Sequence, residues 1–117
     1  MKNRYTLFHN PRCSKSRQAL EILKNKNITP NIFLYLENKL SKKDIKELLQ
    51  KLNLSIRDVL REGEDVYKNN KIKNKKLSDY QLINYVIKFP KLLERPIIVT
   101  DKKGLIARPP EKVLKLL

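Results

Sequence analysis

The chain has 117 residues, a single cysteine and a formal net charge of +15 at pH 7. One cysteine allows no internal disulfide, and no apolar run approaches the ~18 residues needed to cross a bilayer. Met1-Lys2-Asn3-Arg4 leads directly into a strand pattern instead of a secretion signal. We therefore expect one soluble, cytoplasmic domain over residues 1–117, with a core that requires neither disulfides nor a structural metal.

The positive charge raises the question of nucleic-acid binding, because a basic surface is typical of that class of protein. Lysine accounts for most of the excess and is spread along the whole chain. The densest stretch, Lys68 to Lys76, has no interleaved aromatic residue on which bases could stack. A solvated face is therefore the favoured interpretation, and nucleic acid is not expected as a specific partner.

Two apolar strands flank the first predicted helix. Tyr5 to Phe8 has the pattern of a short buried strand, and Ile32 to Leu36 has the same pattern after Pro30. Between them, apolar residues recur at helical spacing from Ser16, at Ala19, Leu20 and Leu23. A strand, helix and strand within some thirty residues form a βαβ unit, so the two strands should be parallel.

Cys13 falls at or just before the N-terminus of that first helix. Unpaired backbone N–H groups and the positive end of the helix dipole favour an anion there. Arg12, Lys15 and Arg17 lie close by in the sequence. This setting favours a reactive thiolate next to an oxyanion-binding position. The alternative is a buried thiol with a purely structural role.

Helices are expected to fill the middle of the chain. Ser41 with Asp44 is a capping-box pattern, and so is Ser78 with Gln81. Apolar residues follow each pattern at helical spacing, at Ile45, Leu48, Leu49 and Leu52 and at Leu82, Ile83, Val86 and Ile87. A short helix is expected around Ile56 to Leu60, a short helix plus loop from Gly63 to Lys76, and a stop at Pro90.

The last third of the chain has the pattern of a hairpin followed by a helix. Ile97 to Thr100 and Leu105 to Ala107 are strand patterns, and the turn residues 101–104 join them as antiparallel neighbours. Pro109 and Pro110 then begin a terminal helix. Its apolar side is expected to carry Val113, Leu114 and Leu117.

The order β-α-β, helices, α-β-β-α predicts an α/β protein with the thioredoxin-like fold and a mixed sheet. The helical insert should span about residues 41–90. In such folds a proline that opens the third strand is cis and lies against the active-site thiol. Arg95-Pro96 stands at that point, and we expect this bond to be cis.

Four motifs resemble the glutaredoxin-coupled arsenate reductases, the ArsC family. They are His9-Asn10-Pro11 through Cys13 to Ser16-Arg17, Arg57-Asp58-Val59-Leu60-Arg61, Glu94-Arg95-Pro96-Ile97-Ile98-Val99, and Arg108-Pro109-Pro110-Glu111. The resemblance implies that Cys13 attacks arsenate and that Arg61, Arg95 and Arg108 bind the oxyanion. Guanidinium groups suit this task, because they bind tetrahedral oxyanions bidentately and stay charged. Arg57, in the second motif, is instead a candidate for a structural ion pair with a nearby acidic residue.

His9, Ser16, Arg17 and Pro96 are the expected supporting residues of the site. By resemblance the His9 imidazole interacts with the thiol, where an imidazolium would favour the thiolate; alternatively, it caps the turn at the end of the strand. Ser16 and Arg17 could donate hydrogen bonds to the thiolate or to a bound oxyanion. The cations around Cys13 make this chain look more like a housekeeping branch of the family, whose physiological substrate need not be arsenate.

A single cysteine implies an external reducing thiol. We expect glutathione as co-substrate and glutaredoxin as partner, in a monomer with no bound cofactor and no metal. Two other functions stay open. One is an Spx-like transcription regulator that binds the RNA polymerase α subunit, although Cys13-Ser14-Lys15-Ser16 lacks a second cysteine for a disulfide switch. The other is a general glutathione-linked thiol oxidoreductase, which would leave Arg61 and Arg108 without a role.

Overall fold

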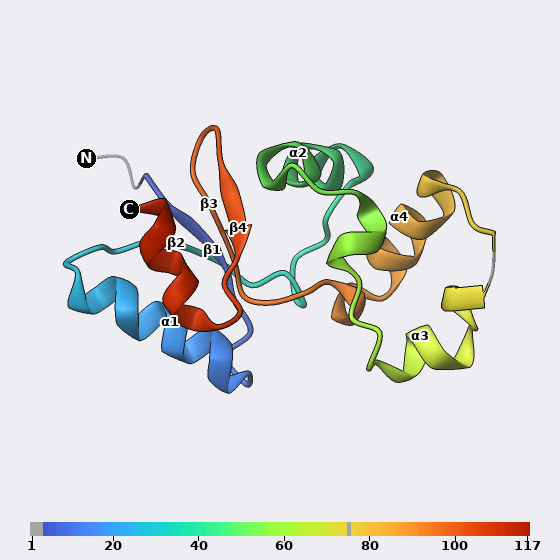
Figure 1. Cartoon of the computed structure of the whole chain (residues 1–117), viewed down its shortest axis with the longest axis horizontal. Helices are drawn as coiled ribbons and strands as arrows, with labels where there is room; N and C mark the ends of the chain where they lie inside the picture. The colour runs from blue at the N-terminus through green and yellow to red at the C-terminus, as the bar shows by residue number, and fades with distance from the viewer. Residues whose placement is uncertain (1–3, 75) are drawn as a thin grey trace.

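The computed structural model describes residues 4–74 and 76–117. Four short strands form one mixed sheet in the order β2-β1-β3-β4 (Figure 1). They are β1 (Thr6–Phe8), β2 (Asn31–Phe33), β3 (Ile97–Val99) and β4 (Gly104–Ile106). As predicted, β1 is parallel to β2, and β3 is antiparallel to β4; β3 also pairs with β1 in the antiparallel sense.

One face of the sheet is covered by α1 (Ser14–Asn25) and the terminal 3₁₀-helix η4 (Pro110–Leu116), which pack against each other (Figure 1). Successive side chains of a strand point to opposite faces. Leu7 and Ile98, which are register partners, therefore both lie beneath these helices. With Ala19, Leu23, Ala107 and Val113 they form a compact apolar cluster.

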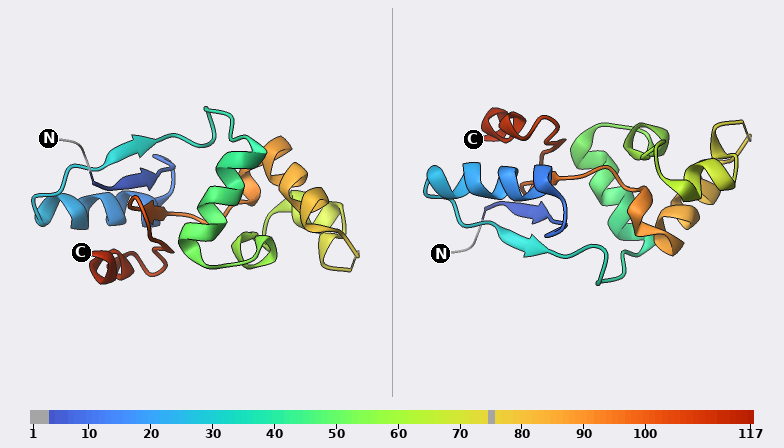
Figure 2. Two further views of the ribbon diagram at one scale, coloured as in Figure 1. Left: turned by 90° about the horizontal axis from the view of Figure 1, so that it is seen from above. Right: turned by 90° about the horizontal axis from the view of Figure 1, so that it is seen from below.

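The opposite face is covered by α2 (Lys42–Leu52), and the remaining helices lie beyond the end of the sheet toward which β1 points (Figure 2). These are η1 (Ile56–Val59), α3 (Asp65–Asn69), η2 (Ile72–Asn74), α4 (Asp79–Lys88) and η3 (Pro90–Leu92). A larger apolar cluster runs from Ile97 and Val99 of β3 into this helical half. The molecule is accordingly elongated, 44 × 26 × 24 Å.

Both predicted capping boxes are confirmed. The Ser41 and Ser78 hydroxyls accept from the N–H groups of Asp44 and Gln81, whose side chains accept in return from the serine N–H groups. The order of strands and helices agrees with the predicted α/β, thioredoxin-like arrangement. The Arg95-Pro96 bond is cis, as expected, and Arg108-Pro109 is also cis, which the sequence analysis did not anticipate.

The second strand is shorter than predicted. It ends at Phe33, and the predicted extension to Leu36 is wrong. The chain turns at Leu34 because its carbonyl accepts hydrogen bonds from the N–H groups of Glu37 and Asn38, each at 3.0 Å. This turn directs Tyr35 into the large cluster, where only 1% of the residue is exposed.

The apolar side predicted for the terminal helix is also wrong in part. Val113 is buried, but Leu114 and Leu117 are 44% and 46% exposed. The segment is a 3₁₀-helix, in which residues three apart lie in one row. Pro110 and Val113 are therefore buried together, and Leu116 packs against the smaller cluster instead of Leu114 or Leu117.

Short backbone contacts join residues 59–61 to residues 92–94. Leu60 and Leu93 form an isolated antiparallel bridge. On either side of it, the Arg61 N–H donates to the Leu92 carbonyl at 2.7 Å, and the Glu94 N–H donates to the Val59 carbonyl at 2.8 Å. This pairing fixes the backbone at Arg61 beside the segment that leads into β3.

Candidate active site around Cys13

Cys13 is the N-cap residue of α1, as the helical spacing predicted. Its backbone is extended, and its carbonyl accepts a hydrogen bond from the Arg17 N–H at 3.0 Å. The preceding turn is closed by the Cys13 N–H, which donates to the Asn10 carbonyl at 2.9 Å, and by the Arg12 N–H, which donates to Asn10 Oδ1 at 3.0 Å. The partly buried thiol is thus held beside the N–H groups of the first helical turn.

The pKa of the Cys13 thiol lies below its ordinary value. Burial raises this pKa, but the Ser16 N–H, the Arg95 side chain and the Lys15 N–H lower it by hydrogen bonding, and the charge of Arg95 lowers it further. Donors of this kind stabilise the charged form of an acid. The reactive thiolate is therefore favoured at this position.

His9, Asn10 and Ser16 form a buried polar cluster behind the loop. His9 Nδ1 lies 2.6 Å from Ser16 Oγ, which also accepts from the Asn10 N–H at 3.1 Å. Burial, followed by the charges of Arg17 and Lys24, lowers the pKa of His9. A neutral imidazole whose Nδ1 accepts a hydrogen bond from the Ser16 hydroxyl agrees with both observations. This geometry favours the turn-capping alternative for His9 over an imidazolium beside the thiol.

The other three supporting residues are placed in different ways. Ser16 acts on the thiol through its backbone N–H, because its hydroxyl is engaged by His9 and Asn10. Arg17 Nη1 donates to the Pro11 carbonyl at 2.8 Å and so braces the loop from outside. Pro96 follows the cis bond at Arg95 and precedes β3.

Arg95 is the arginine whose side chain acts on the pKa of the Cys13 thiol. Burial lowers the pKa of its guanidinium, but hydrogen bonding to Cys13 and the charges of Tyr35, Cys13 and Glu64 raise it above its ordinary value. Its Nε is buried and has no hydrogen-bond partner within the described part of the chain. Arg95 therefore stabilises the thiolate while one of its buried donors is still unpaired.

Arg108 is hydrogen-bonded to the backbone of Arg95. Its Nη1 donates to the Arg95 carbonyl at 3.2 Å, in an exposed position. Among the described residues, the two arginines precede the two cis bonds, and they lie just before β3 and just after β4, which are hydrogen-bonded neighbours. The hairpin thus brings together two of the three predicted oxyanion-binding residues.

Arg61 comes from the helical half. Its Nε lies 3.9 Å from Glu94 Oε1, which is at the limit of an ion pair, and its Nη1 is buried without a hydrogen-bond partner among residues 4–74 and 76–117. By contrast, Arg57 Nη1 donates to the Ile72 carbonyl at 3.4 Å, within the helical half. The pairing of residues 59–61 with 92–94 brings Arg61 close to Arg95 along the backbone.

Tyr35 is a residue that the sequence analysis did not connect with the site. Burial raises its pKa to about 12, although the charge of Arg95 and, more weakly, that of Arg61 act in the opposite direction. The charge of Cys13 also raises the pKa of Tyr35. Its hydroxyl is buried and has no partner in the described structure. The sequence carries no signal for this burial, because its pattern predicts a strand through Leu36, whereas β2 ends at Phe33, two positions before Tyr35.

Three other kinds of functional feature were considered: a second groove, a metal site and a membrane-spanning helix. A groove of about 270 Å³ between the sheet and α2 is lined by Phe8, Phe33 and Leu48, among others, but by none of the candidate residues. The described residues contain no cluster of three histidine, cysteine or carboxylate side chains arranged to hold a metal. Within the described ranges, no helix has the length and apolar character required to cross a membrane.

The chain is similar to known proteins over nearly its whole length. The model of the ArsC family matches residues 8–116. The Escherichia coli protein YfgD is 41% identical over 117 residues, and the match covers 99% of this chain and 98% of YfgD. An arsenate reductase of Haemophilus influenzae is 38% identical over 112 residues, and the match covers 95% of this chain and 97% of that protein. The solved structure of an arsenate reductase from Vibrio cholerae matches with a TM-score of 0.93 at 40% identity, over 97% of each chain.

Proposed function

Because the chain belongs to the ArsC family, we propose that it reduces an oxyanion of the arsenate class with Cys13 as the nucleophile. The observation that carries the proposal is the position of Cys13 at the N-cap of α1, where the Ser16 N–H and the Arg95 side chain lower the pKa of the thiol. A lowered thiol pKa supplies the nucleophile, and the unpaired buried Nε of Arg95, the arginine that acts on this thiol, is available to a tetrahedral anion.

The arginines have the chemistry to hold such an anion. Arg95 Nε and Arg61 Nη1 are buried donors that lack partners among the described residues. A buried donor without a partner costs about 1–3 kcal/mol, which an oxyanion oxygen would recover. Arg108, exposed at the same corner, would complete the set from the solvent side.

The first proposed step keeps arsenic in its +5 state. The Cys13 thiolate attacks arsenic, an arsenic–oxygen bond breaks, and the departing oxygen takes up protons and leaves as water. The product is an S–As ester on Cys13, and its remaining oxygens stay on the arginines. Donors fixed in place before the reaction stabilise the charge that builds on those oxygens.

Two electrons then come from two thiols. Glutathione displaces a second oxygen as water, and the sulfur of Cys13 joins the glutathione sulfur as arsenic leaves in the +3 state. The protein is left with a mixed disulfide, which glutaredoxin reduces by thiol–disulfide exchange. An internal resolving step is impossible, because Cys13 is the only cysteine of the chain.

The test is arsenate-dependent NADPH oxidation coupled through glutathione, glutathione reductase and glutaredoxin. Turnover should require glutathione, and thioredoxin with its reductase should support little activity. Mass spectrometry of a reaction stopped without glutaredoxin should find glutathione on Cys13. Full turnover with thioredoxin alone, or a mixed disulfide that never forms, would contradict the proposed reductant.

The regulator alternative is tested separately by a pull-down with the C-terminal domain of the RNA polymerase α subunit. Its support is the net charge of +15, which would favour an acidic partner surface. We expect no specific retention. Stoichiometric binding together with no arsenate reduction would favour a regulator over a reductase.

A further inference from the structure

An ion pair between Arg61 and Glu94 joins the helical half to the segment that leads into β3. Arg61 Nε lies 3.9 Å from Glu94 Oε1, which is close enough for electrostatic attraction but beyond the length of a hydrogen bond. The two side chains are only 22% and 27% exposed, so salt and water screen their charges incompletely. The proposed reaction uses Arg61 to bind the oxyanion and assigns no role to Glu94.

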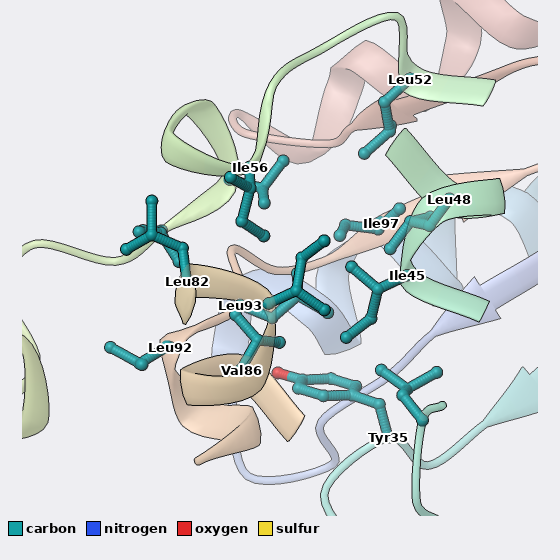
Figure 3. Close-up of a cluster of buried hydrophobic side chains, with 14 of the residues drawn as sticks. Tyr35, Ile45, Leu48, Leu52, Ile56, Leu82, Val86, Leu92, Leu93 and Ile97 are labelled. Atoms are coloured by element: carbon teal, nitrogen blue, oxygen red, sulfur yellow. The ribbon is translucent and has the colours of Figure 1, made fainter. Parts of the chain in front are cut away.

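The backbone places these two residues independently of their side chains. Leu60 lies opposite Leu93 in the isolated bridge, and Figure 3 shows Leu93 among the buried side chains of the large apolar cluster. The hydrogen bonds on either side of the bridge are donated by the backbone N–H groups of Arg61 and Glu94. In an antiparallel pairing of this register the two residues are diagonal neighbours, a separation that long side chains can span. The register should therefore persist when the Glu94 carboxylate is removed.

The pair neutralises the charge of Arg61 and leaves hydrogen-bond donors open. An arginine bound tightly to a carboxylate commonly forms two parallel hydrogen bonds with it. Here Glu94 Oε1 lies outside the hydrogen-bond range of Nε, and Arg61 Nη1 is buried without a hydrogen-bond partner among the described residues. A loose ion pair of this kind contributes little to stability. Arg61 is thus held near a counter-ion while it can still bind another anion.

We propose that Glu94 is a positioning residue that holds the Arg61 guanidinium in the free protein and competes with the oxyanion for it. This inference rests on the proposed role of Arg61 in binding the oxyanion. A carboxylate and a tetrahedral oxyanion are both acceptors for one guanidinium, and their charges repel each other at short range. An anion with several oxygens can contact more than one arginine, which offsets the loss of the contact between Arg61 and Glu94. Glu94 therefore neutralises Arg61 in the free protein and lowers the affinity of the site for anions.

The test is Glu94→Gln, which keeps the size of the side chain and removes its charge. Inorganic phosphate is the probe, because it is a tetrahedral oxyanion that thiols do not reduce. Phosphate bound beside Cys13 should slow alkylation of the thiol by iodoacetamide. Half-protection should require about two- to fivefold less phosphate in Glu94→Gln than in the wild type, the range expected for one partly exposed ion pair. An unchanged or higher half-protecting concentration would overturn the proposal.

Turnover provides a second measurement on the same variant. The KM for arsenate should fall by a similar factor in Glu94→Gln, and kcat should change less, because the competition acts on binding. A purely structural role of Glu94 would not lower KM. A KM that stays the same or rises would therefore contradict the proposal.

Two further variants separate this competition from a general change of charge. Glu62→Gln removes the same charge one residue after Arg61, from an exposed side chain, and should leave phosphate protection unchanged. An equal decrease in that variant would overturn the proposal, because net charge alone would then explain the effect. In an Arg61→Gln background, Glu94→Gln should have a much smaller effect on protection, whereas an undiminished effect would show that Glu94 does not act through Arg61.

Failure of this inference differs from failure of the proposed function. If neither phosphate nor arsenate protects the wild-type thiol, there is no oxyanion site beside Cys13 and both proposals fall. If phosphate protects the wild type and Glu94→Gln equally, the role of Glu94 is rejected and the proposed reduction stands. If Glu94→Gln binds phosphate more tightly in a protein that does not reduce arsenate, the role of Glu94 is supported and the proposed reaction is rejected.

Discussion

The two sides of the site differ in how completely their polar groups are paired. On the loop side, His9 Nδ1, Ser16 Oγ and the Asn10 N–H satisfy one another in a buried cluster, and the turn hydrogen bonds hold Cys13 at the start of α1. On the arginine side, Arg61 Nη1, Arg95 Nε and the Tyr35 hydroxyl are buried and lack hydrogen-bond partners among the described residues. The paired side holds the nucleophile in place, and the unpaired side leaves donors for a ligand.

This difference has a physical reason. A buried donor without a partner destabilises the folded state, so most are paired in proteins. Those that stay unpaired next to a partly buried nucleophile are better explained by a ligand than by stability. We therefore expect changes on the arginine side to affect catalysis more than folding, and changes on the loop side to affect folding as well.

The largest effect on turnover is expected for Cys13→Ser, which removes the thiol that lies between the loop side and the arginine side. An alcohol has a far higher pKa than a thiol and cannot supply the anion, so turnover should be lost. The circular dichroism spectrum and unfolding midpoint should stay close to those of the wild type, because the turn bonds use the backbone of Cys13. Retained arsenate reduction would mean that the nucleophile lies elsewhere.

Lysine substitutions test the arginine side while the charge is kept. Arg95→Lys should reduce kcat/KM by about 10- to 100-fold, or roughly 1–3 kcal/mol, because a point charge cannot reproduce the fork of a guanidinium. Arg108→Lys should have a smaller effect, because its described bond is an exposed one to the Arg95 carbonyl. Wild-type kinetics in both variants, and in Arg61→Lys, would place the oxyanion site elsewhere.

Ser16→Ala tests whether the loop side is important for folding. The change leaves His9 Nδ1 and the Asn10 N–H buried without their shared partner, which should lower the free energy of unfolding by about 1–3 kcal/mol. Urea denaturation measures this loss. Ser14→Ala, at the exposed first residue of α1, is the matched control and should change little. Equal stability of the two variants would show that the buried cluster does not stabilise the loop.

The smallest expected effect is the contribution of His9 to the pH dependence of the free energy of unfolding. The pKa of His9 is lowered in the folded protein, so below the unfolded-state pKa of about 6.5 the unfolded chain binds more protons. Stability should therefore be fully present above that pH and should decrease as the pH falls below it toward the folded-state pKa. Urea titrations at several pH values measure this slope, and His9→Gln should flatten it just below pH 6.5. An identical slope in both proteins would assign the effect to other groups.

Much of the fold followed from local patterns. Capping boxes at Ser41 and Ser78, strand patterns at β1 and β3 and the helical spacing after Cys13 each depend on neighbours in the sequence. Each of these elements was found, with β1 beginning one residue later and β3 ending one residue earlier than predicted. The errors arose where local patterns are ambiguous. An apolar run after Pro30 fits a strand as well as a turn with a buried Tyr35, and Val113 to Leu117 fits an α-helix as well as a 3₁₀-helix.

For the site, the sequence by itself placed Cys13 on the loop side, because the first turn of α1 and the bonds that hold the loop lie between His9 and Arg17, which are close together in the chain. Only the tertiary structure decided the arginine side. Arg61, Arg95 and Tyr35 are separated by 26 residues or more along the chain. A long-range backbone bridge holds residues 59–61 beside residues 92–94, and Tyr35 packs in the large apolar cluster. Which of several arginines faces the thiol depends on how the helical half packs on the sheet, and no local pattern encodes that packing.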